Sequence, residues 1–221
     1  MKPFAAGKIR FSGGTVKPNL SKISLCVALF AVVFAGCGTT DQIIVPSRIA
    51  RPPDSPAPVP YGDRVAVADF SYKPLDEMNV IGRDYDRVRK IIWEGDPGSL
   101  MADLVADALF ERGVLVFRLK EDEPLDNYSS VIGGAVLRFE AEIRRRSMVQ
   151  LQIEVTVEMN LSVSGPSAKV PWETSVSSKA VFQQMFPGPE DIQKALSSAA
   201  NSAADEAVRR LRERGLTKSL R

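Results

Sequence analysis

The segment Val149–Val163, with the sequence VQLQIEVTVEMNLSV, decides the fold class. Apolar and polar residues alternate along the whole of this segment without a break. A period of two is typical of a β-strand that buries one face and leaves the other in water. Because sheets with one wet face are usually antiparallel, the pattern predicts an antiparallel-rich sheet that is covered on its apolar face only.

Further strands are expected on both sides of this segment. Residues 136–144 repeat the alternation, with Leu137 and Phe139 expected to point inward, and residues 145–147 suit a tight turn between the two strands. Apolar and β-branched stretches predict the remaining strands at 64–70, 114–119 and 172–183. The sheet should therefore contain about four to five strands.

Two helices are expected. Residues 99–112 place apolar side chains at spacings of three and four, with Ser99 as the N-cap and Gly113 as the stop. A longer helix should begin at Pro189, and it carries an alanine-rich apolar stripe. The fold class is thus α+β, with both helices packed on one face of the sheet. The order strand, helix, strand over residues 64–119 suggests a βαβ-like opening.

Composition excludes several kinds of catalytic chemistry. The chain has no histidine and only two cysteines, Cys26 and Cys37. Catalytic triads, histidine zinc sites and cysteine–histidine pairs therefore cannot form. Carboxylates occur at 84, 86, 94 and 96, but basic residues among them favour a solvated loop over a calcium site. We expect no enzyme activity, no cofactor and no metal.

The N-terminal segment predicts export. Residues 1–22 are polar and basic, and residues 23–36 are apolar or small. A helix over this apolar stretch would reach roughly 21 Å, short of the ~30 Å hydrocarbon core, so a cleaved signal peptide is favoured over a membrane span. Phe34-Ala35-Gly36-Cys37 resembles the lipobox of bacterial lipoproteins. The resemblance implies cleavage between Gly36 and Cys37 and a lipid on Cys37 that anchors the chain to the membrane.

Some features of this segment leave alternatives open. A signal peptide without lipidation and a later translation start both fit the sequence. Gly38, rather than aspartate, after the cysteine favours the outer membrane, facing the periplasm, although the inner membrane stays possible. Residues 1–36 hold five basic residues and no acidic ones, which leaves 24 basic and 27 acidic residues, or −3, after cleavage. We therefore expect no nucleic-acid partner.

The expected domain organisation follows from these features. Residues 1–36 are the signal peptide, and residues 37–63 are the lipidated cysteine and a disordered linker, since six prolines fall within 38–63. Residues 64–216 form a single domain, and residues 217–221 form a tail. At ~3 Å per residue, the linker could hold the domain up to ~75 Å from the lipid.

Residues 71–98 are the candidate partner-binding segment. They connect the first expected strand to the first helix without a strong period, which is long for a compact domain. Part of the segment, 84–93, could form a short amphipathic helix. The alternative is that it covers an open edge of the core. The residues expected to contact a partner are Trp93, Ile91, Ile92, Arg87 and Arg89.

Three stretches of sequence carry a wider resemblance. VAVADF at 65–70, LMADLVADALFERG at 100–113 and VLVF at 114–117 look like the opening of the YajG-type periplasmic lipoproteins and of the group related to the TolB N-terminal domain and LpoB. The resemblance implies an α/β sandwich in the cell envelope, a role in assembly, and no catalytic residue. We therefore expect a non-enzymatic binding or assembly module for another envelope component, with an envelope protein as the expected partner. The alternatives are a lipid-binding auxiliary lipoprotein of a lipid-transport ABC system and a carboxylate-based periplasmic glycan hydrolase.

Overall fold

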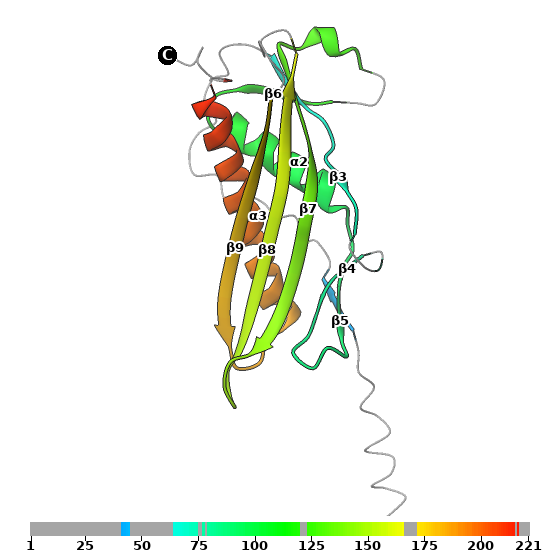
Figure 1. The fold of residues 1–221 in the computed structure, drawn as a ribbon, viewed down its shortest axis with the longest axis vertical. Helices are drawn as coiled ribbons and strands as arrows, with labels where there is room; N and C mark the ends of the chain where they lie inside the picture. The colour runs from blue at the N-terminus through cyan, green and yellow to red at the C-terminus, as the bar shows by residue number, and fades with distance from the viewer. Residues whose placement is uncertain are drawn as a thin grey trace, which may run out of the picture. The chain divides into compact units, whose positions relative to one another are not determined.

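The computed structural model describes residues 41–44, 64–74, 77, 79–119, 123–165, 172–214 and 216. The chain divides into two units, Met1–Thr39 and Thr40–Arg221, and every described residue belongs to the second. Within this part of the chain, one sheet of nine strands packs against two α-helices. Figure 1 shows the long strands of the sheet in front of the helices. The α+β class is confirmed, but the sheet is larger than the expected four to five strands, and it is mixed rather than mainly antiparallel.

The long strand β7 (Ser130–Arg145) organises the sheet. Along one edge it pairs antiparallel with β8 (Leu151–Ser164), which in turn pairs antiparallel with β9 (Trp172–Gln184). Along the other edge β7 pairs in parallel with three short strands in succession: β2 (Arg64–Val67), β3 (Ser71–Tyr72) and β4 (Val80–Arg83). The outer strands are β6 (Leu115–Arg118), parallel to β2; β5 (Lys90–Trp93), antiparallel to β4; and β1 (Gln42–Ile44), parallel to β5.

The strands that the sequence did not predict are all short. Strands β1, β3, β4 and β5 are two to four residues long, too short to display a period of two. The first of them lies inside the expected linker, and its last residue, Ile44, is only 1% exposed. The ordered domain therefore begins before Arg64. The signal peptide, the rest of the linker at 45–63 and the tail at 217–221 lie outside the described residues.

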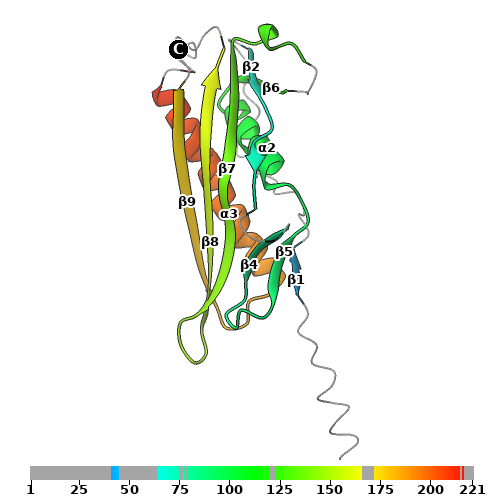
Figure 2. The ribbon, with the colours of Figure 1, turned by 45° about the vertical axis from the view of Figure 1, so that its right-hand side comes forward.

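Both helices lie on the same face of the sheet, behind the strands in Figure 2, as predicted. Helix α2 (Pro97–Phe110) begins two residues earlier than expected, because the N-cap is Asp96. The Asp96 carboxylate accepts hydrogen bonds from the backbone N–H of Gly98 and Ser99. Strands β2 and β6 are parallel neighbours with α2 between them in sequence, so the predicted βαβ-like opening is confirmed.

Helix α3 (Pro189–Glu213) begins at the predicted proline. The Asp191 carboxylate accepts a hydrogen bond from the backbone N–H of Gly188 and so satisfies a free group at the helix start. The apolar stripe of the helix is fully buried: Ile192, Leu196, Ala199, Ala203, Ala207 and Leu211. Its small alanine side chains let the helix backbone pack close to the sheet.

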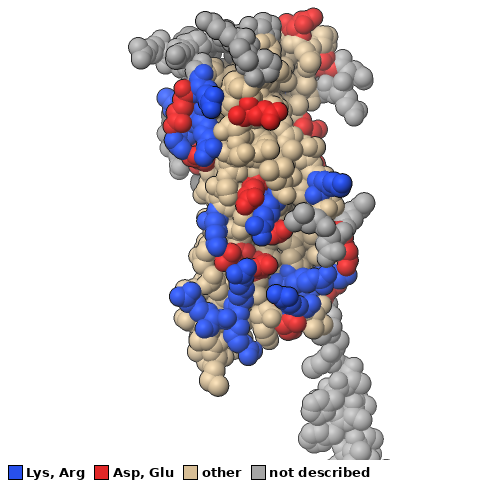
Figure 3. All heavy atoms as spheres, viewed as in Figure 1, with Lys and Arg blue, Asp and Glu red and all other residues tan. Residues whose placement is uncertain are grey.

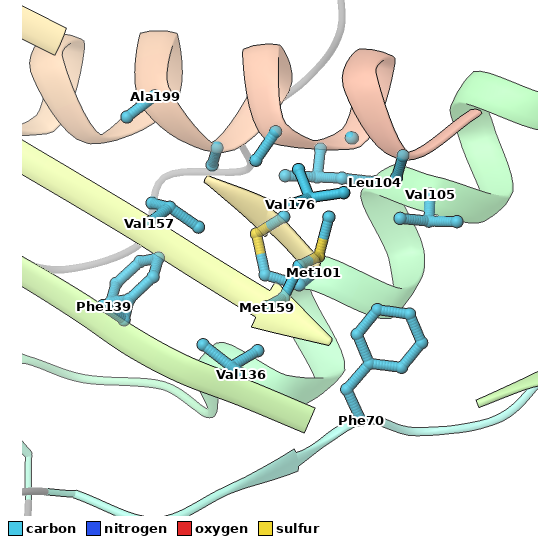
Figure 4. Packing of buried hydrophobic residues seen from close by; sticks show 14 of the residues in the cluster. Phe70, Met101, Leu104, Val105, Val136, Phe139, Val157, Met159, Val176 and Ala199 are labelled. Atoms are coloured by element: carbon cyan, nitrogen blue, oxygen red, sulfur yellow. The ribbon is translucent and has the colours of Figure 1, made fainter. Parts of the chain in front are cut away.

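The hydrophobic core fills the space between the sheet and the helices (Figure 4). The inward face of β8 is the predicted one, with these residues buried: Ile153, Val155, Val157, Met159, Leu161 and Val163. Two expected inward residues are exposed instead. Val149 lies in the β7–β8 turn, and Leu137 sits at a β-bulge between Val136 and Arg138, where one extra residue turns its side chain to the surface.

Candidate binding groove

The segment expected to bind a partner is a β-hairpin, not a loop with an amphipathic helix. Strands β4 and β5 pair through a turn at 84–89, in which Arg87 adopts a positive φ of 59°. Trp93 is 1% exposed, and its ring meets Phe139 edge-on with the ring centroids 5.5 Å apart. Ile91 is also fully buried. These two side chains therefore belong to the hydrophobic core. Their burial agrees with the alternative interpretation, in which residues 71–98 cover an open edge of the core.

The remaining residues of the expected site are accessible. Arg87 is exposed, and Ile92 and Arg89 are half-buried. Arg89 forms an ion pair with the buried carboxylate of Asp84, at 3.1 Å, and thereby holds the β4–β5 turn to the end of β4. Gly36 and Cys37 lie outside the described residues, so the predicted cleavage and lipidation stay predictions.

A groove of about 700 Å³ runs between β4 with its following turn and the outer face of β7. Its floor comes from β7, between Leu137 and Arg145, and Tyr72 of β3 also lines it. The bulge in β7 makes Leu137 47% exposed, so it offers an apolar contact among charged neighbours. The groove therefore lies on the wet face of the sheet, opposite the helices.

Gly82 allows β4 to reach β7 at this groove. A Cβ atom at this position would lie 1.6 Å from the carbonyl oxygen of Ala141, which no side chain can tolerate. Gly82 pairs with Ala141 in the parallel ladder, and only the following residue, Arg83, continues it. The close approach of the two backbones at one glycine thus fixes one wall of the groove.

Arginine dominates the charge of the groove. Its lining contains five arginines against three carboxylates: Arg83, Arg87, Arg138, Arg144 and Arg145 against Asp84, Glu140 and Glu142. Figure 3 shows Lys and Arg side chains gathered on the lower part of this face. The surplus of two positive charges suits a ligand or partner segment that carries negative charge.

The carboxylates of the groove are bound to arginines. Glu140 accepts a hydrogen bond from Arg138 at 2.6 Å, and this bond raises the pKa of Arg138 above its ordinary value. Glu142 is bound in the same way by Arg144. Burial raises the pKa of the Tyr72 hydroxyl, which leaves it a neutral hydrogen-bond donor at the groove edge. The arrangement offers ion pairs and hydrogen bonds to a partner.

The described residues contain neither a metal-binding cluster of side chains nor a membrane-spanning helix. No group of three or more Cys, Asp or Glu side chains in that part of the chain is placed to hold a metal ion. None of the helices there is long and apolar enough to cross a membrane. The carboxylates at 84 and 96 serve instead as an ion-pair partner and as a helix N-cap.

The sequence matches no family model, and no curated protein matches it. Solved structures do share its fold. A Xanthomonas campestris protein of the family model DUF330 is 15% identical, with a TM-score of 0.54, and the match covers 81% of this chain and 100% of that chain. This likeness establishes a shared fold with a bacterial protein family.

Two other solved structures are more distant. The PelC dodecamer from Paraburkholderia phytofirmans is 17% identical with a TM-score of 0.40, and the match covers 70% of this chain and 93% of that chain. A minor lipoprotein from Acinetobacter baumannii is 9% identical with a TM-score of 0.36, covering 69% and 91%.

Proposed function

We propose that this chain is a lipid-anchored protein of the bacterial envelope that binds another envelope protein through the groove between β4 and β7 and catalyses no reaction. The observation that carries the proposal is the groove itself, whose volume of about 700 Å³ is lined by five arginines around an exposed Leu137. Arginine is enriched at the hot spots of protein-binding sites, and Arg87, Arg144 and Arg145 of the groove are exposed. The partner should present an acidic segment.

The N-terminal sequence supports the envelope location. Phe34-Ala35-Gly36-Cys37 has the order of a lipobox after a basic and an apolar segment. A lipid on Cys37 would anchor the chain, and Gly38 favours the outer membrane with the domain facing the periplasm. Lipid chains stabilise membrane binding by about 0.8 kcal/mol for each buried methylene, so several chains on one cysteine give a lasting anchor.

No observation favours the two alternative functions. A lipid-binding auxiliary protein needs an apolar pocket, whereas eight of the sixteen residues that line this groove are charged. A glycan hydrolase needs one carboxylic acid that keeps its proton. Glu140 and Glu142 instead accept hydrogen bonds from arginines.

Site-specific crosslinking in cells tests the proposal. A photo-reactive amino acid in place of Leu137 lies in the groove, and the same amino acid in place of Val181 of β9 is a matched control, because both side chains are about half exposed. We expect a crosslinked envelope protein at position 137 and none at 181. Charge reversal with Arg87→Glu should abolish the product. Identical products at both positions, or none at 137, would contradict the groove as the binding site.

A further inference from the structure

Three turns lie together at one end of the sheet. The β7–β8 turn (146–150) lies beside the β9–α3 connection (185–188), because Leu151 of β8 pairs with Gln184 of β9. The β4–β5 turn (84–89) lies at the same end, since β4 runs parallel to β7. A hollow of about 380 Å³ is lined by all three turns, and the Arg145 guanidinium lies over the Tyr85 ring, 5.1 Å from its centroid.

These turns expose apolar side chains to an unusual degree. Met148 is 98% exposed and Phe186 is 89% exposed. Of the ten large apolar residues exposed in the described part of the chain, six belong to the three turns, which we call the apolar tip: Tyr85, Val88, Met148, Val149, Met185 and Phe186. Exposed apolar side chains that cluster in this way mark a surface that binds a membrane or another molecule.

Basic side chains lie close to the turns of the apolar tip in the sequence. Arg144, Arg145 and Arg146 are consecutive in the chain just before Met148. Arg87 and Arg89 come from the β4–β5 turn, and Figure 3 shows the lower end of this face rich in blue side chains. Apolar side chains at a tip with arginines behind them match the layers of an anionic membrane surface, which has hydrocarbon beneath phosphate.

The chain enters the domain at the same end. Strand β1 runs parallel to β5, and the Asp41 carboxylate just before β1 accepts a hydrogen bond from the backbone N–H of Lys90, at 2.9 Å. Lys90 follows the β4–β5 turn directly. Only residues 38–40 separate Cys37 from Asp41 in the sequence, so covalent geometry limits this reach to about 14 Å.

We propose that the apolar tip sits in the surface of an anionic membrane, with Met148 and Phe186 among the lipid chains and the arginines at the phosphates. The proposal rests on the lipid anchor of the proposed function, because it is the short reach from Cys37 that keeps this end of the domain at the membrane. The end of the domain with Leu125 then points away from the lipid.

Depth-dependent fluorescence quenching tests the orientation. Single cysteines replace Met148, Phe186 or, as the control, Leu125, whose side chain is also exposed. Leu125 comes shortly before Ser130, where β7 begins, and so lies toward the other end of that strand from the β7–β8 turn. The full chain is produced in bacteria, purified with its lipid and placed in phosphatidylethanolamine vesicles containing phosphatidylglycerol. Each cysteine carries a polarity-sensitive dye, and part of the lipid carries a nitroxide on its acyl chain.

We expect strong quenching and a blue shift for the dyes at 148 and 186, and neither at 125. Quenching at the tip should weaken in vesicles without phosphatidylglycerol and with Arg146→Glu. Vesicle-bound protein whose tip dyes are quenched no more than the control would overturn the tip proposal while the anchor stands. A blue shift of the tip dyes without quenching by the nitroxide lipid would also overturn the tip proposal, because a second protein copy can shield the dyes from water in that way. Protein that does not bind vesicles at all would contradict the anchor of the proposed function, and the tip proposal with it.

Discussion

The strands β7–β9 and the strands β1–β6 form two different halves of one sheet. The first half consists of three long antiparallel strands, joined in sequence order, with registers that run along most of their length. The second half consists of strands of two to four residues that pair mostly in parallel with partners distant in sequence. The long half holds its own register, whereas the short half depends on buried side chains beneath it, such as Ile44 and Trp93.

The two halves also contribute different parts of the groove and of the apolar tip. The long half supplies the outer face of β7, which is the rigid floor of the groove. The short half supplies the opposite wall of the groove, which is β4 with its following turn. It also supplies two elements at the end of the domain that carries the tip: the β4–β5 turn and the entry of the chain into β1. Recognition by turns on a rigid scaffold is common in proteins. Substitutions that act on one half at a time can therefore separate stability from binding.

The largest effect is expected in the long half. Val155 is fully buried in the middle of β8, so Val155→Asp would bury an unpaired charge and should lower the free energy of unfolding by at least about 4 kcal/mol. Thr156 is its neighbour on the wet face, opposite Glu140 and Lys179. Thr156→Asp should cost no more than about 1 kcal/mol. Equal losses in chemical denaturation would show that the two faces are assigned wrongly.

The next effect is expected in the short half, at Trp93. Trp93→Ala removes a buried indole that packs on Phe139 and should cost about 3–5 kcal/mol. Trp93→Phe keeps an aromatic ring and removes an indole N–H that has no hydrogen-bond partner among the described residues, so it should cost much less. Thermal melting measures both. A Trp93→Ala protein with an unchanged melting temperature would mean that the side chain is not part of the core.

A smaller effect should follow from the strand that begins the domain. Ile44 is buried in β1, at the outer edge of the short half, so Ile44→Ala should cost about 2 kcal/mol, the lower end of the range for this change in a core. Ile44→Val removes a single methylene and should cost about 1 kcal/mol. If Ile44→Ala melts like the unchanged protein, β1 contributes nothing, and the reach from Cys37 to the domain is longer than about 14 Å.

The smallest effect is expected on the stability of the protein at acidic pH. Hydrogen bonds from Arg209 and Arg210 lower the pKa of Glu206 on α3 to about 2. Because the folded-state pKa is depressed, the stabilisation is present above the ordinary pKa of about 4.5 and is lost as the pH falls toward about 2. A hydrogen bond from Lys179 lowers the pKa of Glu154 in the same direction. Glu206→Gln should flatten the acid dependence of stability by no more than about 1 kcal/mol. An unchanged pH profile would contradict this account.

The same division explains what the sequence could predict. The alternation in β8 and the apolar stripe of α3 each extend over many residues, so local pattern alone predicts the strand, the helix and their buried faces. Strands β3 and β4 exist because β7 offers them an edge, and β5 in turn pairs with β4. The close approach of Gly82 to Ala141 is likewise a fact of tertiary packing. The bulge at Leu137 shifts the alternation in a way that the sequence does not mark. The charged residues Arg138, Glu140, Glu142 and Arg144, at every second position, were a signal for the groove, but they predicted only a wet face.

The lipid on Cys37 is the central claim, because both the envelope location and the orientation of the tip depend on it. Metabolic labelling with an alkyne-bearing fatty acid, applied to the unchanged full chain and to Cys37→Ser, tests it directly. We expect the unchanged chain to be labelled and to appear in the membrane fraction, and the Cys37→Ser chain to stay unlabelled as an uncleaved or mislocalised precursor. A Cys37→Ser chain that still incorporates the labelled fatty acid would contradict the assignment.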